Sequence, residues 1–293
     1  MKDSPITKVL LAGATGYLGS FILQDLLTHA CYPTRVIVRS KKKLAKSILE
    51  NPEAEIVNAE VTNQASVEGC CKGIDVVIST VGITQQKEGL TYMDVDYQAN
   101  INLLRDAKQN GVRKFIYVSV FNGENLTHLK ICKAKEKFVH ELKNSGLDYC
   151  IIRPTGYFSD MGEFYKMAAK GRVVLFGDGE NKMNPIHGQD LAEVCVNAIS
   201  RNEKEIAVGG PQVLSYNQIA SLAFSVVGKN PRVTRISPRV TNFILAITRL
   251  VSTSKFYGPI EFFITVLTTN LTAPGYGTRS LKEYFRELKT ASG

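Results

Sequence analysis

The sequence has few of the residues that build metal sites or disulfide frameworks. Its four histidines are scattered, and its six cysteines show no paired C-x-x-C spacing. Zinc sites need ligands grouped at short spacing, so we predict no metal. Because the cysteines show no paired spacing, we expect them to be reduced thiols in the cytoplasm. No apolar run reaches the roughly 18 residues of a membrane span. The amino terminus also lacks the apolar stretch of a secretory signal.

The charge balance is basic, with a formal net charge of +9. The basic residues are spread along the chain apart from Lys41, Lys42 and Lys43, and no recognised nucleic-acid module is present. We therefore expect no nucleic-acid partner. An anionic cofactor or substrate explains part of the charge, and a solvated basic surface explains the rest equally well.

Short apolar runs alternate with helical patterns through the first half of the chain. Six runs predict strands: Lys8–Ala12, Thr34–Arg39, Glu55–Ala59, Asp75–Thr80, Lys114–Ser119 and Asp148–Arg153. Helices are predicted between them, for example at Tyr17–Thr28, Thr91–Asn110 and Lys133–Asn144. Strands and helices in this alternation are typical of a doubly wound parallel α/β sheet of the Rossmann type.

The pattern changes after Pro154, where turn residues become frequent. We expect a helix from Asp190 to about Ser200, a short strand near Ile206–Val208, and helical segments from there to the end. The sequence thus predicts a Rossmann domain at 1–154 and a smaller substrate lobe at 155–293. The strand near 206–208 is a candidate to return to the main sheet.

A glycine-rich turn follows the first predicted strand. Gly13, Gly16 and Gly19 are spaced as in dinucleotide-binding turns, where they permit a tight bend, backbone approach to a pyrophosphate and close helix packing. The amino terminus of the next helix would face the phosphates with free N–H groups. The whole turn is predicted to bind the cofactor: Gly13, Ala14, Thr15, Gly16, Tyr17, Leu18 and Gly19.

The second predicted strand ends at Arg39, where an NAD-specific protein would carry an acidic residue. A guanidinium at this position suits a 2′-phosphate, with Ser40 and Lys41 beside it. We therefore expect NADP(H) as the cofactor. The alternative is a solvated basic turn.

Two further strand ends fit the same cofactor. Val61 follows the third strand and could flank the adenine, while Thr80, Val81 and Gly82 end the fourth beside the pyrophosphate. Either segment could equally be a loop without a ligand.

Several motifs together resemble the short-chain dehydrogenase/reductase superfamily in its atypical branch. They are Gly13-Ala-Thr-Gly16-Tyr-Leu-Gly19, Asp94-Val-Asp96-Tyr-x-x-Asn100-x-Asn102, Phe115-Ile-Tyr-Val-Ser119 and Arg153-Pro154-Thr155. Further segments resemble most the divinyl chlorophyllide reductase-like group, and less closely NmrA-like regulators: Lys133-Ala-Lys135, Phe176-Gly-Asp-Gly179, Asn184-Pro-Ile-x-x-x-Asp190 and Gly209-Gly-Pro211.

The resemblance implies an NADP(H) enzyme with an altered acid site. If Lys135 is the lysine of the family's Tyr-x-x-x-Lys pair, Ile131 occupies the tyrosine position, and an aliphatic side chain cannot donate a proton. Lys135 is then the candidate catalytic residue. Ser119, Lys135 and Pro154 are implied cofactor-binding residues.

An aromatic and thioether wall follows Pro154, where the substrate cleft of the family opens. Tyr157, Phe158 and Met161 are candidate substrate residues for a flat apolar molecule, although such residues are more often part of a core. His187 lies in a motif that usually packs beneath the cleft, and we expect it to be structural.

Three functional hypotheses follow from these residues. The first is an NADPH-dependent reductase that transfers hydride to an apolar unsaturated or carbonyl small molecule, as a monomer or homodimer. The second is a non-catalytic NADP(H)-sensing regulator or assembly factor. The third adds a peripheral membrane contact through the basic, apolar segment Val240–Leu271.

Overall fold

The computed structural model describes residues 7–30, 32–86, 89–251 and 254–292. Cys31 lies outside the described residues. The other cysteines, Cys70, Cys71, Cys132, Cys150 and Cys195, are buried free thiols. Burial raises the pKa of the Cys150 thiol to about 11.

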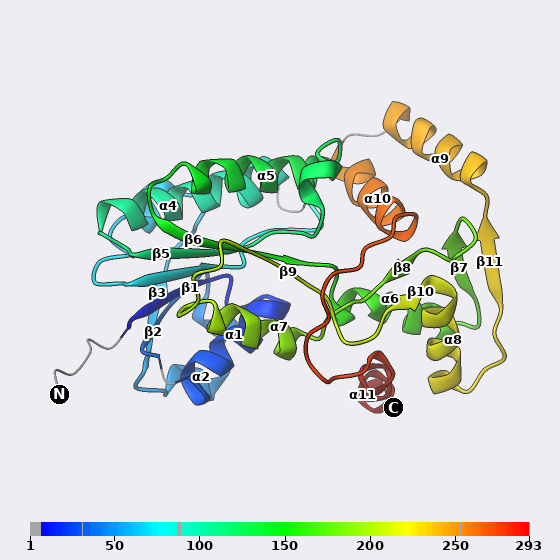
Figure 1. The fold of residues 1–293 in the computed structure, drawn as a ribbon, viewed down its shortest axis with the longest axis horizontal. Coiled ribbons are helices and arrows are strands. Elements are labelled where there is room, and N and C mark those ends of the chain that lie inside the picture. The colour runs from blue at the N-terminus through cyan, green and yellow to red at the C-terminus, as the bar shows by residue number, and fades with distance from the viewer. Residues whose placement is uncertain (1–6, 31, 87–88, 252–253, 293) are drawn as a thin grey trace.

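The main sheet has seven parallel strands in the order β3-β2-β1-β4-β5-β6-β9 (Figure 1). The first six confirm the six predicted strands, and the seventh is the strand expected near residues 206–208. Their bounds are β1 Val9–Ala12, β2 Thr34–Val38, β3 Ala54–Asn58, β4 Val76–Ser79, β5 Lys114–Val118, β6 Asp148–Pro154 and β9 Glu205–Val208. Strands β1, β4 and β5 are buried throughout, because helices cover both faces of the sheet.

Helices α4 and α5 cover one face of the sheet, and α1, α2 and α7 cover the other (Figure 1). The bounds of the helices of this half are α1 Tyr17–Thr28, α2 Lys46–Leu49, α3 Gln64–Val67, α4 Asn100–Gln109, α5 Lys130–Lys143 and α7 Gly188–Asn197, with short 3-10 turns at Lys41–Lys43 and Gly123–Leu126. The strand order reverses between β1 and β4. In open parallel sheets, ligands bind at the carboxyl ends of the strands beside such a reversal.

The helix predicted at Thr91–Asn110 is not uniform. It begins as a π-helix at Met93–Ala99 and becomes α-helical only at α4. The buried Asn100 amide donates to the carbonyls of Val95 and Asp96, at 3.3 and 3.0 Å, and so competes with the regular backbone ladder.

The remaining elements form a second lobe with its own core of Phe164, Tyr216, Phe224 and Phe285. Their bounds are α6 Phe158–Ala169, β7 Val173–Phe176, β8 Lys182–Met183, β10 Leu214–Ser215, α8 Tyr216–Val227, β11 Val233–Ile236, α9 Pro238–Val251, α10 Ser254–Leu267 and α11 Leu281–Ser292. The prediction that only helices follow the 206–208 strand was wrong, because β10 pairs with β8 and β11 pairs with β7.

The division of the chain at residue 154 stays a prediction. Two elements that follow this boundary lie with the main sheet: β9 pairs with β6, and α7 packs beside α1. The chain therefore passes from the sheet to the lobe and back before it completes the lobe.

Candidate functional site

The glycine turn joins β1 to α1 in a bend that leaves little space for side chains. Gly13 has a φ of +91°, and the Gly16 N–H donates to its carbonyl at 3.0 Å. A Cβ on Gly19 would collide with the Gly13 carbonyl, and one on Gly13 would collide with the Thr80 hydroxyl. Gly13 and Gly19 thus have the steric reasons expected of a dinucleotide turn.

The amino terminus of α1 opens at the tip of this turn. Its N-cap is Gly16, which has no side chain to cap the first N–H groups, and both Thr15 and Gly16 are exposed. Ala14, Leu18 and Gly19 are buried beneath them. Such a helix terminus suits a phosphate group.

Arg39 lies immediately after β2, whose Ile37 pairs with Ala12 of β1. The turn and Arg39 therefore share one edge of the sheet. The Arg39 side chain is 52% exposed, and its Nε lies 3.9 Å from a Glu60 carboxylate oxygen. Ser40 begins the exposed 3-10 turn that contains Lys41.

The ends of β3 and β4 lie along the same edge. The Thr80 hydroxyl donates to the carbonyls of Ala12 and Gly13, at 3.3 and 3.4 Å. Val81 is buried, and its carbonyl accepts from the Asn100 amide at 3.2 Å. Val61 is half-buried, and its carbonyl accepts from Asn102.

Lys135 of α5 lies against the end of β4 as one member of a buried polar cluster. Its Nζ is 3.1 Å from Asp96 Oδ1 and 3.5 Å from the Tyr117 hydroxyl. A Cβ on Gly82 would lie 2.9 Å from this Nζ and 2.6 Å from Asp96 Oδ1. A glycine at position 82 therefore brings the backbone after β4 close to the ion pair, at the sheet edge where the cofactor is expected to bind.

The charge state of the cluster follows from its contacts. Burial favours a neutral Lys135, but the neighbouring Tyr117 and Asp96 outweigh it and raise the pKa of the ammonium. Burial also raises the pKa of Asp96, against the pull of Lys135, which would favour the neutral acid. The 3.1 Å contact, and the Ile83 N–H that donates to the other oxygen of Asp96, support the ionised pair. Burial raises the pKa of Tyr117 to about 12, so this phenol stays protonated.

Ile131 occupies the position of the family's tyrosine, and its aliphatic side chain offers no polar group to the cluster around Lys135. It is 5% exposed and packs in an apolar cluster with Tyr92, Leu126 and Leu129. Phe262 of α10 packs against the same cluster. Position 131 is therefore part of the packing between α5 and α10.

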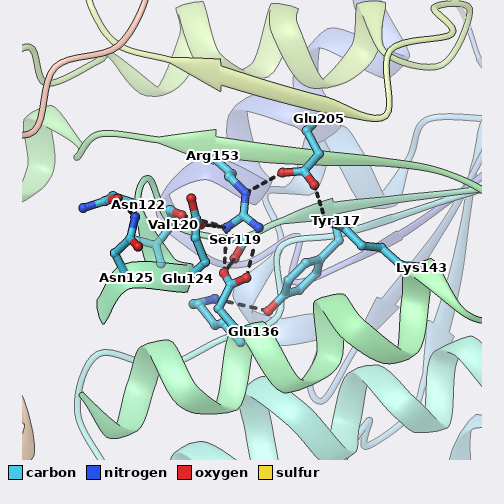
Figure 2. Close-up of polar contacts among 11 residues, drawn as sticks. Tyr117, Ser119, Val120, Asn122, Glu124, Asn125, Glu136, Lys143, Arg153 and Glu205 are labelled. Carbon is cyan, nitrogen blue, oxygen red and sulfur yellow. Dashed lines mark hydrogen bonds and ion pairs between the residues drawn. The ribbon is translucent and has the colours of Figure 1, made fainter. Parts of the chain in front are cut away.

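Ser119 belongs to a neighbouring network centred on Arg153 (Figure 2). The Ser119 hydroxyl donates to Glu136 at 3.2 Å, and the Arg153 guanidinium binds both oxygens of Glu136, at 2.6 and 3.0 Å. Arg153 also donates to Glu205 of β9 at 2.9 Å. Pro154 follows as the last, buried residue of β6.

The three candidate substrate residues occupy different environments. Phe158 and Met161 are buried in the core of the second lobe. Tyr157 is half-buried, and its ring centroid lies 5.9 Å from that of Tyr17 in an edge-to-face arrangement. Burial raises the pKa of the Tyr157 phenol, while the nearby Lys135 ammonium acts to lower it.

His187 caps α7, where its Nδ1 accepts from the Gln189 N–H at 3.1 Å. Two other polar residues of the same motif hold chain segments together. The Asn184 amide donates to the carbonyls of Gly210 and Ala273, and Asp190 is paired with Arg279. The contacts of these residues give the motif a structural role, which is to join segments that are distant in sequence.

Sequence reasoning gave no role to Asp96, Tyr117 or Glu136. The first two lie within motifs quoted for the resemblance, yet only the fold brings them to Lys135. The available sequence signal for Asp96 was its place in the Asp94-Val-Asp96-Tyr-x-x-Asn100 motif.

A protein-family model described as NAD(P)H-binding matches residues 13–202 of the chain, and this match shows the family. This range contains the glycine turn, the strand ends and Lys135. The NAD(P)H cofactor expected from the turn is thereby supported independently of the geometry.

Curated relatives include a reductase and an assembly factor. The chain is 26% identical over 261 residues to divinyl chlorophyllide a 8-vinyl-reductase of Arabidopsis thaliana, which covers 82% of this chain and 62% of the relative. It is 25% identical over 248 residues to the photosystem II assembly factor Ycf39 of Synechocystis, which covers 83% of this chain and 74% of the relative. The chain therefore spans less than two thirds of the Arabidopsis reductase.

Solved structures share the fold at low identity. An NADPH-dependent quinone oxidoreductase of Escherichia coli, solved with NADPH, matches with a TM-score of 0.76 at 18% identity over 96% of this chain and 99% of the other. A nucleoside-diphosphate-sugar epimerase of Staphylococcus aureus matches with a TM-score of 0.75 at 16% identity over 96% and 100%. Taken with the turn and the matched range, these findings show that the chain belongs to the NAD(P)H-binding family.

Proposed function

We propose that the protein is an NADPH-dependent reductase of the atypical short-chain dehydrogenase/reductase type. Its substrate would be an apolar small molecule with a carbonyl group or a conjugated double bond. The observation that carries the proposal is the contact of Lys135 and Asp96 with Gly82, at the strand end beside the glycine turn. A charged side chain is held there at the edge expected to bind the cofactor.

The bound dinucleotide would supply hydride. Lys135 would hold a positive charge, fixed by Asp96, where a substrate oxygen gains negative charge. A fixed charge in a water-poor site stabilises such an oxygen far more than water does. Tyr157 would line the substrate side of the same cluster. The basic side chain of Arg39 supports NADPH over NADH.

Lys135→Met tests this assignment. The purified protein would be given NADPH with a panel of enones, quinones and aldehydes, and the loss of NADPH absorbance would be followed. We expect turnover with at least one class, and a fall of roughly a hundredfold or more in kcat for the variant. Lys133→Met is the matched control, since Lys133 is an exposed lysine of the same helix. Equal activity of the wild type and Lys135→Met would remove Lys135 from the chemistry.

The packing of Ile131 favours a second candidate, a non-catalytic NADP(H)-sensing regulator or assembly factor. Ile131 fills the tyrosine position within an apolar cluster against which Phe262 of α10 packs, and one relative is named as an assembly factor. Tight dinucleotide binding without oxidation of NADPH by any substrate in the panel would favour this role over the reductase.

The proposal includes a cytoplasmic location and a monomeric or homodimeric state. The five buried free thiols support a reducing compartment. Sedimentation analysis of the purified protein would determine the oligomeric state.

A further inference from the structure

Helix α9 is the outermost helix of the second lobe (Figure 1). It follows β11 directly and packs chiefly beside α10. Several of its large apolar side chains are exposed, with Phe243 65% and Leu250 86% accessible to solvent. Val240 and Ile247 are exposed as well.

These four residues form one stripe along the helix. Their spacing of three, four and three residues places Val240, Phe243, Ile247 and Leu250 on a single face. Thr241, on another face, is 3% exposed. The helix therefore exposes this apolar stripe to solvent, whereas an ordinary surface helix turns its apolar stripe toward the core.

The charge around this stripe has one sign. No Asp or Glu occurs between Glu205 and Glu261, whereas Lys or Arg occurs at 229, 232, 235, 239, 249 and 255. Among the described side chains, Arg235 and Arg239 are exposed close to the start of the helix. A second copy of the chain would bring cations against cations, whereas an anionic surface would complement them.

Helix α10, which packs beside α9, also exposes two large apolar side chains, Ile260 and Phe263. Among the described residues, no helix is long and apolar enough to cross a bilayer. An amphipathic helix with basic flanks instead lies in the plane of a bilayer, with its apolar face among the acyl chains.

We propose that α9 docks on the surface of an anionic phospholipid bilayer. Val240, Phe243, Ile247 and Leu250 enter the boundary of the acyl chains, and the exposed Arg239 at the start of the helix faces the headgroups. This docking is independent of the reductase proposed above, because the helix contributes no residue to the cofactor site.

Vesicle flotation tests the docking. Full-length protein is floated with phosphatidylcholine vesicles that contain or lack phosphatidylglycerol. We expect binding to the anionic vesicles, with a loss of roughly tenfold or more in Phe243→Ser/Leu250→Ser, because two large apolar groups no longer leave water. Leu49→Ser/Val213→Ser, which removes two exposed apolar residues elsewhere, is the control and should float like the wild type. Binding that is equal for the two double variants would overturn the proposal.

A spectroscopic readout separates insertion from other contacts. The chain contains no tryptophan, so Phe243→Trp introduces a single reporter. Its emission should shift to the blue with anionic vesicles, and Leu49→Trp should not respond. If wild-type protein does not float, and Phe243→Ser/Leu250→Ser abolishes a concentration-dependent dimer, the stripe is a self-association surface and lipid docking is wrong.

Discussion

At the scale of single residues, the cofactor edge depends on a few positions where only glycine fits. Gly19 packs against the Gly13 carbonyl, and Gly82 packs against the ion pair of Asp96 and Lys135. The first contact shapes the turn and the second joins the turn edge to the polar cluster. Substitutions at these positions affect ligand binding through the backbone.

Gly19→Ala is expected to weaken NADPH binding by about tenfold or more. The added methyl group overlaps the Gly13 carbonyl, so the backbone of the turn must shift. Such overpacking typically costs about 1–3 kcal/mol. Titration of the cofactor measures the change. Gly162→Ala is the control, because its Cβ would meet its nearest neighbour at an ordinary 3.6 Å. Unchanged affinity in Gly19→Ala would show that the turn tolerates a side chain.

Arg39→Asp is expected to weaken NADPH binding by about tenfold or more and to change NADH binding little. The variant replaces a cation beside the expected 2′-phosphate with an anion, and charged hydrogen bonds contribute about 1.5–3 kcal/mol. Lys108→Asp makes the same charge change at an exposed position on α4. If both dinucleotides weaken equally, Arg39 does not select NADPH.

Much of the layout of the candidate cofactor edge could be predicted from the sequence, because its residues follow individual strands. The turn, Arg39 and Gly82 each follow directly from one strand. The partners of Lys135 could not, because Asp96 and Tyr117 come from different elements and meet only through the packing of the sheet against its helices. Periodicity identifies the face of a helix, and it does not reveal which distant side chain will meet that face.

At the scale of elements, the sequence predicts the buried strands of the structure better than the exposed ones. The main strands are apolar runs buried on both faces, and such runs are conspicuous. β11 was missed because it is short, with Thr234 and Arg235 exposed. The π-helix before α4 was missed because helical periodicity does not reveal the bonds of the Asn100 side-chain amide to the carbonyls of Val95 and Asp96.

The cap of α7 gives an element-scale prediction. His187→Ala should destabilise the protein by about 1 kcal/mol or more, since it removes the acceptor of the Gln189 N–H. His187→Asn should retain the cap, because asparagine is a favoured N-cap residue. Urea denaturation at neutral pH measures both. Equal losses in the two variants would show that ring packing, and not the cap, is what matters.

The same residue gives a pH dependence with a definite sign. Burial, followed by the nearby Arg279, lowers the pKa of His187, so the unfolded chain binds a proton more readily than the folded one. Folding stability should therefore fall as the pH drops below the ordinary value of 6.5. Protonated Nδ1 also cannot accept the Gln189 N–H. The stability difference between His187→Asn and wild type should shift in favour of the variant in acid, and a constant difference would contradict this linkage.

At the scale of the whole molecule, Arg153 connects elements that are distant in sequence. It joins β6 to Glu136 of α5 and to Glu205 of β9 (Figure 2). We expect Arg153→Met to cost about 3 kcal/mol, since it leaves the buried Glu136 carboxylate without its cation. Glu136→Gln should cost less stability, because Arg153 retains its hydrogen bonds to Glu205 and to the Val120 carbonyl. Denaturant titration of both variants checks this order, and the reverse order would contradict it.

The position of β9 has a consequence for synthesis on the ribosome. Strand β9, which borders β6, is translated only after α6, β7, β8 and α7, so the sheet edge stays open until more than two thirds of the chain has emerged. An open parallel edge is a template for unwanted pairing. A fragment that ends at residue 154 would keep this edge permanently, together with the face of α1 that α7 covers. The nucleotide-binding half therefore needs a later piece of the chain before it is complete, and shortened versions should aggregate where the whole chain does not.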